Sequence, residues 1–158
     1  MKRPIVRRAD IADIGDIYAL EQRCFSAPWP LEALYEDICI SGHIYYVIIV
    51  QDKIIGYAGF WMILDEAHVN NICILPEYRQ RGYGKRLLET IIVAAFELGA
   101  DSMTLEVRAS NFPAIHLYQA FDFEIEGVRK GYYQDSKEDA FIMWKQGIRR
   151  EMIQMGLG

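Results

Sequence analysis

The feature that most constrains the fold lies near the middle of the chain, where an apolar run, a basic loop with two glycines and an apolar helical pattern follow one another. Residues 71–74 read Asn-Ile-Cys-Ile, and residues 79–85 read Arg-Gln-Arg-Gly-Tyr-Gly-Lys. Glycines let successive backbone N–H groups face one point, and the N-terminus of a helix favours an anion. This order predicts a strand, a phosphate-binding loop and a helix.

The loop matches neither of the common nucleotide-binding motifs. A P-loop needs Ser or Thr after its Gly-Lys pair, where this chain has Arg86, and a dinucleotide-binding loop needs a third glycine, where it has Leu87. The pattern that remains is R-x-x-G-x-G, from Arg79 to Gly84. A solvated turn containing two glycines and three basic residues would look similar, so the spacing alone leaves both interpretations open.

Length and composition place the chain among globular proteins. Because 158 residues suffice for one core, we predict a single domain over residues 1–158, with 146–158 as a C-terminal tail. Apolar residues make up 52% and charged residues 25%, which excludes disordered and collagen-like classes. The formal net charge of −5 argues against a nucleic-acid-binding protein and suits a basic partner.

The cysteines and the N-terminal residues bear on the compartment. The cysteines are Cys24, Cys39 and Cys73. Their number is odd and their spacing is not that of a metal site, so we interpret them as reduced, small apolar residues and expect no metal. Asp10, Asp13 and Asp16 interrupt what would be the apolar part of a signal peptide, and the longest apolar run, 44–50, is too short to span a membrane. We therefore expect a cytoplasmic protein without a membrane partner.

Hydrophobic periodicity and breaker residues predict alternating strands and helices. The expected strands are 5–8, 45–50, 54–64, 67–74, 102–107, 123–129 and 140–144. The first expected helix ends at Cys24 with Asp10 as its N-cap, and the second covers about 31–40. The third runs from Gly84 to a stop at Gly99, and the fourth follows Asn111 to about Ala120. The apolar face of the third helix comprises Leu87, Ile91, Ala94, Ala95 and Leu98. Strands that alternate with helices and close in hairpins imply a mixed α/β, three-layer domain.

With these motifs the chain resembles the GNAT superfamily of acetyl-coenzyme A dependent N-acetyltransferases, whose signature is this loop between the fourth strand and the third helix. Within the superfamily it is similar to the bacterial ribosomal-protein-alanine N-acetyltransferases. The similar segments are 65–67, 105–111, 114–118 and 132–140, and the resemblance extends to about Lys145. It implies a GNAT-type three-layer domain with a mixed, mostly antiparallel central sheet of about seven strands flanked by helices.

The resemblance also implies acetyl-coenzyme A as the cosubstrate and assigns the residues that bind it. The backbone of Ile72, Cys73 and Ile74 should pair with the pantetheine arm like an added strand, and a local N–H should polarise the acetyl carbonyl. The pyrophosphate contacts should come from Gln80, Arg81, Gly82, Tyr83, Gly84 and Lys85. Asn111 matches a position that hydrogen-bonds the cofactor, whereas Asp122 departs from the family by standing where glycine is usual, which puts the local turn geometry in doubt.

Two residues are the expected catalytic groups. Glu106 lies near the end of a predicted strand, on the face opposite to Leu105 and Val107, and composition alone allows a carboxylate that is solvated or ion-paired beside Arg108. The resemblance makes Glu106 the general base and Tyr118 the acid that protonates the leaving thiolate. From the residues alone, Tyr118 can also be a core residue whose hydroxyl is hydrogen-bonded, without a catalytic role. His68 and His116 are competitors, for which a structural or surface role is the better interpretation.

The loops around Trp29 and around Tyr132 and Tyr133 resemble the two loops that flank the peptide N-terminus in N-terminal acetyltransferases, although such aromatic residues can equally pack beneath a loop. The resulting hypothesis is a cytoplasmic enzyme that acetylates a protein's N-terminal amine, most specifically the alanine of small-subunit ribosomal protein eighteen, by direct attack in a ternary complex. The alternatives are a broader N-terminal or small-amine acetyltransferase of the same fold and a non-catalytic coenzyme A binding module. The sequence leaves open the acceptor, the oligomeric state and the role of the tail.

Overall fold

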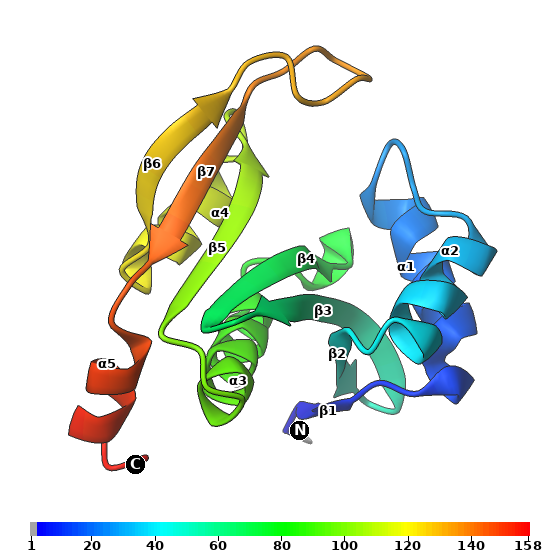
Figure 1. Ribbon diagram of the computed structural model, residues 1–158. Coiled ribbons are helices and arrows are strands. Elements are labelled where there is room, and N and C mark those ends of the chain that lie inside the picture. The colour runs from blue at the N-terminus through cyan, green and yellow to red at the C-terminus, as the bar shows by residue number, and fades with distance from the viewer. Residues whose placement is uncertain (1–2) are drawn as a thin grey trace. The chain divides into compact units, whose positions relative to one another are not determined.

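The computed structural model of the protein describes residues 3–158 (Figure 1). The strands are β1 (Ile5–Arg8), β2 (Ile44–Val50), β3 (Lys53–Ile63), β4 (Glu66–Ile74), β5 (Ser102–Arg108), β6 (Glu124–Arg129) and β7 (Ala140–Lys145). The α-helices are α1 (Ile14–Cys24), α2 (Leu31–Tyr35), α3 (Tyr83–Glu97), α4 (Phe112–Ala120) and α5 (Ile148–Gln154). Short 3-10 turns cover Ile11–Asp13 and Pro76–Tyr78, and a π-helical turn, Glu36–Ile40, follows α2. Every strand expected from the sequence is present, within two residues at each end.

The strands form one hydrogen-bonded order, β1-β2-β3-β4-β5-β7-β6. The pairs β1–β2, β2–β3, β5–β7 and β6–β7 are antiparallel, whereas β4 and β5 pair in parallel, with Glu66 opposite Ser102 and His68 opposite Thr104. This confirms the predicted α/β class and the mixed, mostly antiparallel sheet. Contacts divide the chain into two compact units, the first comprising residues up to 61 with 70–91, and the second 62–69 with 92–158.

In the first unit, local signals set where α1 begins and ends. Asp10 accepts a hydrogen bond from the N–H of Ala12, and Asp13 accepts one from the N–H of Asp10, so the two carboxylates form a capping box around the 3-10 turn that leads into α1. The helix ends at Phe25, whose backbone is extended, ahead of two prolines that cannot continue a helix. Helices α1 and α2 lie against each other (Figure 1).

The β2–β3 hairpin closes through Gln51 and Asp52, whose φ angles of 50° and 65° are those of a two-residue turn with left-handed central residues. Gly59 opposite Tyr45 is required by packing, because a Cβ there would lie 2.3 Å from the Tyr45 ring. The rings of Tyr45 and Tyr57 therefore lie on one face of this hairpin, with centroids 6.1 Å apart.

Helix α3 has the predicted apolar face, because Leu87, Ile91 and Ala95 are fully buried. Leu98 is an error of the sequence prediction: it lies beyond the end of α3 and is 53% exposed. The stop at Gly99 is confirmed, since this residue has a φ of +98° and the N–H of Ala100 bonds back to the carbonyl of Ala95.

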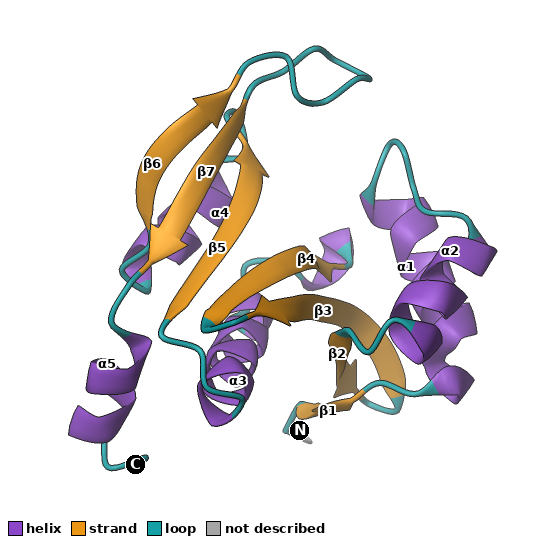
Figure 2. Ribbon diagram, in the orientation of Figure 1, coloured by secondary structure: helices purple, strands orange, loops and turns teal. Residues whose placement is uncertain are grey.

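The second unit contains the β5–β7–β6 ladder with α4 and α5, which Figure 2 distinguishes by secondary structure. The tail left open by the sequence contains α5. Ile148 and Met152 of this helix are buried, and Arg149 donates a hydrogen bond to the carbonyl of Gly99. The buried ammonium of Lys145 contacts the Phe121 carbonyl at 2.7 Å and Glu151 of α5 at 2.6 Å, so its charge is satisfied where the helix joins the sheet.

No helix among residues 3–158 combines the length and the apolar character needed to cross a membrane.

Candidate functional site

The predicted phosphate-binding loop contains two residues with left-handed backbone directly before α3. Gln80 and Gly82 take positive φ angles of 62° and 85°, and α3 begins at Tyr83, directly after Gly82. Arg79 makes an internal hydrogen bond. Its Nε donates to the carbonyl of Ile74 at 2.9 Å and so connects the loop to the end of β4. A Cβ on Gly82 would meet no atom within 4 Å, so the strained φ rather than a steric clash is what favours glycine here.

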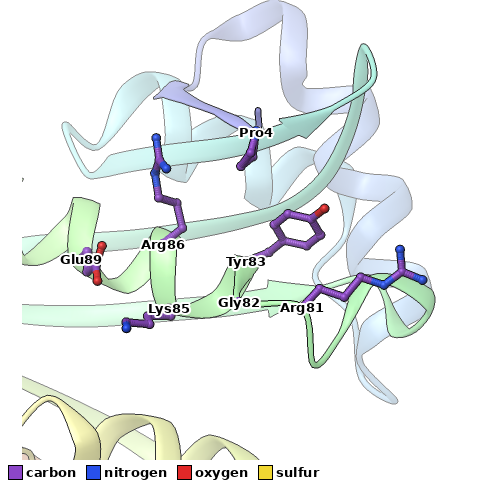
Figure 3. A pocket seen from close by; sticks show the side chains of 7 residues that line it. All are labelled: Pro4, Arg81, Gly82, Tyr83, Lys85, Arg86 and Glu89. Atoms are coloured by element: carbon purple, nitrogen blue, oxygen red, sulfur yellow. The ribbon is translucent and has the colours of Figure 1, made fainter. Parts of the chain in front are cut away.

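A shallow pocket of about 380 Å³ lies over this loop and the first turns of α3 (Figure 3). Its lining residues are Pro4, Arg81, Gly82, Tyr83, Lys85, Arg86 and Glu89. Four of these are predicted pyrophosphate residues, and the concentration of three cationic side chains at a helix N-terminus suits a polyanion. Arg86 was not among the residues predicted to bind the pyrophosphate, although its place directly after the motif was an available signal.

The predicted pantetheine strand is the end of β4. Cys73 and Ile74 are buried, and the N–H of Leu75 bonds to the carbonyl of Ile55. Gly56 packs so closely on this segment that an added Cβ would lie 2.6 Å from the Cys73 carbonyl oxygen. The position of the β4 backbone is therefore set by β3.

Glu106 projects from β5 on the face opposite to the buried Leu105 and Val107, as strand alternation predicts. Tyr132 Oη donates a hydrogen bond to its Oε2 at 3.2 Å, and Arg129 Nη2 lies 3.7 Å from its Oε1. The side chain remains 35% exposed. Its carboxylate is thus oriented by two partners and still accessible to a third.

The cation beside Glu106 is Arg129. The sequence suggested Arg108, its neighbour along the chain, as the partner of an ion pair. Arg108 instead bonds to Asp135 at 2.9 Å and stacks its guanidinium 4.0 Å from the centre of the Tyr133 ring. It thereby holds the segment between β6 and β7.

Tyr132 and Tyr133 lie on this segment with their rings edge to face at 5.0 Å. Tyr132 is 41% exposed, whereas Tyr133 is half-buried. Burial raises the pKa of Tyr133 to about 12, against the opposing effect of Arg108. Tyr132 is thus the more accessible of the two rings, and Tyr133 is the one that packs against Arg108. That Tyr132 and Tyr133 contact the acceptor stays a prediction.

Tyr118 lies on the buried face of α4, and its ring packs 5.8 Å from that of Phe123. Burial, with a smaller contribution from Tyr133, raises the pKa of its phenol above the ordinary value. The phenol is therefore protonated at neutral pH, as a proton donor must be. Because a free thiol has a pKa of about 8.5, full transfer from this phenol to a thiolate is uphill, and a hydrogen bond to the developing thiolate is the more favourable contribution.

The competing histidines have the surface or structural positions expected for them. His116 is exposed on α4 while Tyr118 is buried. His68 Nε2 lies 3.3 Å from Glu66, and its ring meets that of Trp144 edge on.

Asn111 is the N-cap of α4, where its side-chain oxygen accepts from the N–H of Ala114 at 3.3 Å. Asp122 adopts the left-handed conformation with a φ of 67°, so the turn keeps the geometry that glycine would give. No group of three or more metal-ligating side chains is assembled in the part of the chain that the structure describes.

The profile of the acetyltransferase (GNAT) family matches residues 14–123, which include α1, the phosphate-binding loop, Glu106 and Tyr118. The chain belongs to the GNAT acetyltransferase family. Its seven-stranded mixed sheet with flanking helices is the α/β fold of that family.

Similar GNAT proteins share most of their length with this chain. A Bacillus subtilis protein named "Putative ribosomal protein bS18-alanine N-acetyltransferase" is 38% identical over 88% of this chain and 93% of its own length. The crystal structure of the Escherichia coli ribosomal-protein-S18-alanine N-acetyltransferase has a TM-score of 0.84 and 31% identity, covering 91% of this chain and 94% of that one. Arabidopsis thaliana NAA60 in complex with acetyl-CoA, at 16% identity and a TM-score of 0.83 over 91% of this chain and 98% of its own, shares the fold. The protein is an N-acetyltransferase.

Proposed function

We propose that this GNAT enzyme transfers the acetyl group of acetyl-coenzyme A to the N-terminal alanine of ribosomal protein bS18 by direct attack in a ternary complex. The observation that carries the chemistry is the Glu106 carboxylate, which Tyr132 and Arg129 orient while it stays partly exposed. The acceptor is suggested by two relatives, from B. subtilis and E. coli, that are more than 30% identical and carry this activity in their names.

The residues divide the task between binding and proton transfer. The thioester supplies the activated acetyl group. Residues 80–85 hold the pyrophosphate through backbone N–H groups and cationic side chains, the β4 backbone at 72–74 pairs with the pantetheine arm, and Asn111 contributes a polar contact. Glu106 accepts the proton that the attacking amine loses as the new C–N bond forms. As the C–S bond breaks, its electron pair stays on the sulfur, and the Tyr118 hydroxyl donates a hydrogen bond that stabilises the departing thiolate of coenzyme A.

The alternatives differ in what they require of these side chains. A broader amine acetyltransferase would use the same base and acid with a different acceptor. A non-catalytic coenzyme A binding module would have no use for an oriented carboxylate at Glu106, because a binding protein has no transition state to stabilise.

A peptide panel tests the proposed acceptor. Peptides that share one sequence but begin with Ala, Ser, Met or Leu are incubated with the protein and acetyl-coenzyme A, and thiol release is measured. We expect the Ala-first peptide to react fastest. Equal rates for all four would favour the broader acetyltransferase, and no release above the peptide-free rate would favour the binding module.

The phosphate-binding loop gives a second prediction. A valine at position 84 would place a branched side chain in the first turn of α3, where backbone N–H groups are proposed to meet the pyrophosphate, so Gly84→Val should weaken acetyl-coenzyme A binding by about tenfold or more. Calorimetric titration measures this. Gly15→Val is the matched control, since Gly15 lies in the first turn of α1 with nothing within 4 Å of an added Cβ. Unchanged affinity in a folded Gly84→Val protein would refute the assignment.

A further inference from the structure

A buried carboxylate outside the proposed catalytic groups joins three separate segments of the first unit. Glu21, in α1, is 1% exposed. Its Oε1 accepts hydrogen bonds from the hydroxyl of Tyr57 in β3 and from Asn71 Nδ2 in β4, the latter at 3.0 Å. Its Oε2 accepts from the backbone N–H of Trp29 at 3.1 Å. A buried carboxylate is costly unless it is well bonded, so these partners explain how it is tolerated.

The Pro28-Trp29-Pro30 segment of the loop between α1 and α2 offers few backbone donors. Pro28 and Pro30 have no N–H group, so the N–H of Trp29 is the one backbone donor in the Pro28-Trp29-Pro30 segment. The residue before each proline is also restricted to extended backbone. A stiff segment with a single donor is oriented by whatever accepts from that donor. The start of the loop is set by the helix itself, since the N–H of Phe25 makes the last backbone bond of α1, to the Glu21 carbonyl at 3.1 Å.

The other oxygen of the same carboxylate, Oε1, is bonded to β4 through Asn71. Asn71 Nδ2 also contacts the Tyr57 hydroxyl at 3.2 Å, and Asn70 reaches the Tyr45 hydroxyl at 3.2 Å. Adjacent residues of a regular strand point to opposite faces, yet both asparagines reach tyrosines on one face of the β2–β3 hairpin. The strand thus departs from regular alternation immediately before residues 72–74.

We infer that Glu21 is a positioning residue that fixes the Phe25–Pro30 loop relative to β4 and thereby sets the affinity for the acceptor peptide. This inference rests on the proposed function together with the expectation from the sequence that the loop around Trp29 flanks the peptide N-terminus. Glu21 has no role in proton transfer here, since its carboxylate is buried and fully used by its three partners.

Glu21→Gln is the informative variant, because a glutamine offers one acceptor oxygen in place of two. If that oxygen stays with the donors Tyr57 and Asn71, the amide NH2 faces the N–H of Trp29 and the loop loses its attachment. We expect the KM for an Ala-first peptide to rise about tenfold, with kcat within about threefold of wild type and an unchanged Kd for acetyl-coenzyme A.

A second carboxylate in the same unit provides a matched control. Asp37, in the π-helical turn, accepts from the Tyr45 hydroxyl and from Asn70 Nδ2, as Glu21 does from Tyr57 and Asn71, and its described partners do not include the Phe25–Pro30 loop. Asp37→Asn should lower Tm while leaving the acceptor KM unchanged. An equal rise of KM in this control would show that β4 or general stability, not the loop, determines the affinity, and would overturn the inference.

Amide hydrogen exchange measured by NMR tests the contact without depending on activity. In the wild-type protein the Trp29 amide should be protected, and Glu21→Gln should remove this protection while Asp37→Asn preserves it. Exchange of the wild-type Trp29 amide at the rate of an unstructured peptide would refute the inference. If instead Trp29 is protected but no peptide is acetylated at its α-amine, the proposed function fails and the positioning of the loop by Glu21 remains.

Discussion

Replacing Glu106 by glutamine is expected to reduce turnover by about 100-fold or more while leaving the Kd for acetyl-coenzyme A near that of wild type. Glutamine preserves the shape of the side chain, and its oxygen can still accept the hydrogen bond from Tyr132, but it does not accept a proton from the amine. Because Leu105 and Val107, not Glu106, are buried in the core, the variant should fold normally. Steady-state kinetics at saturating concentrations of both substrates gives the comparison.

Glu126→Gln is the control for the change in charge. Glu126 is exposed on β6, and its replacement by glutamine removes one negative charge, as Glu106→Gln does. It should keep wild-type turnover. Tyr118→Phe should also lower turnover at saturating substrate, because it removes the hydroxyl proposed to stabilise the leaving thiolate. If Glu106→Gln and Tyr118→Phe both retain near-normal turnover, the chemistry lies elsewhere, and His68 becomes the residue to test.

Much of the fold was predictable because its signals are local. The Asp10 cap, the prolines after Cys24 and the stop at Gly99 each act over a few residues, and the structure confirms them. Leu98 was misassigned because the apolar periodicity of the sequence continues one residue beyond Glu97, where α3 ends ahead of Gly99. The π-helical turn after α2 was not predicted either, since the sequence pattern of 31–40 is that of a continuous helix.

The environment of the candidate site was less predictable, because it depends on contacts between distant segments. Strand alternation placed Glu106 on the exposed face of β5, but its cation, Arg129, comes from β6 rather than from the adjacent Arg108. The Glu21 carboxylate gave no signal at all: in sequence it is one of several charged residues in α1, and only the tertiary fold buries it beneath Trp29, Tyr57 and Asn71.

The second large effect concerns which amine is acetylated. A peptide that begins with Ala and carries one internal lysine should receive its acetyl group on the α-amine, with at least a 100-fold preference over the lysine side chain. An α-amine has a pKa of about 8 and a lysine about 10.4, so deprotonating lysine at pH 7 costs roughly 3 kcal/mol more. A single carboxylate base such as Glu106, assisted by no metal in the proposed mechanism, offers little to offset this difference.

Mass spectrometry of the product locates the acetyl group, and the same peptide with a blocked α-amine supplies the control. Raising the pH should narrow the preference, because the fraction of deprotonated lysine increases about tenfold per pH unit below its pKa while the α-amine is already largely deprotonated above pH 8. A preference that stays constant from pH 7 to 9 would mean that the loops, rather than amine ionisation, select the acceptor. Acetyl found mainly on lysine, or an equal rate with the blocked peptide, would contradict N-terminal acetylation and leave the general amine acetyltransferase as the function of this site.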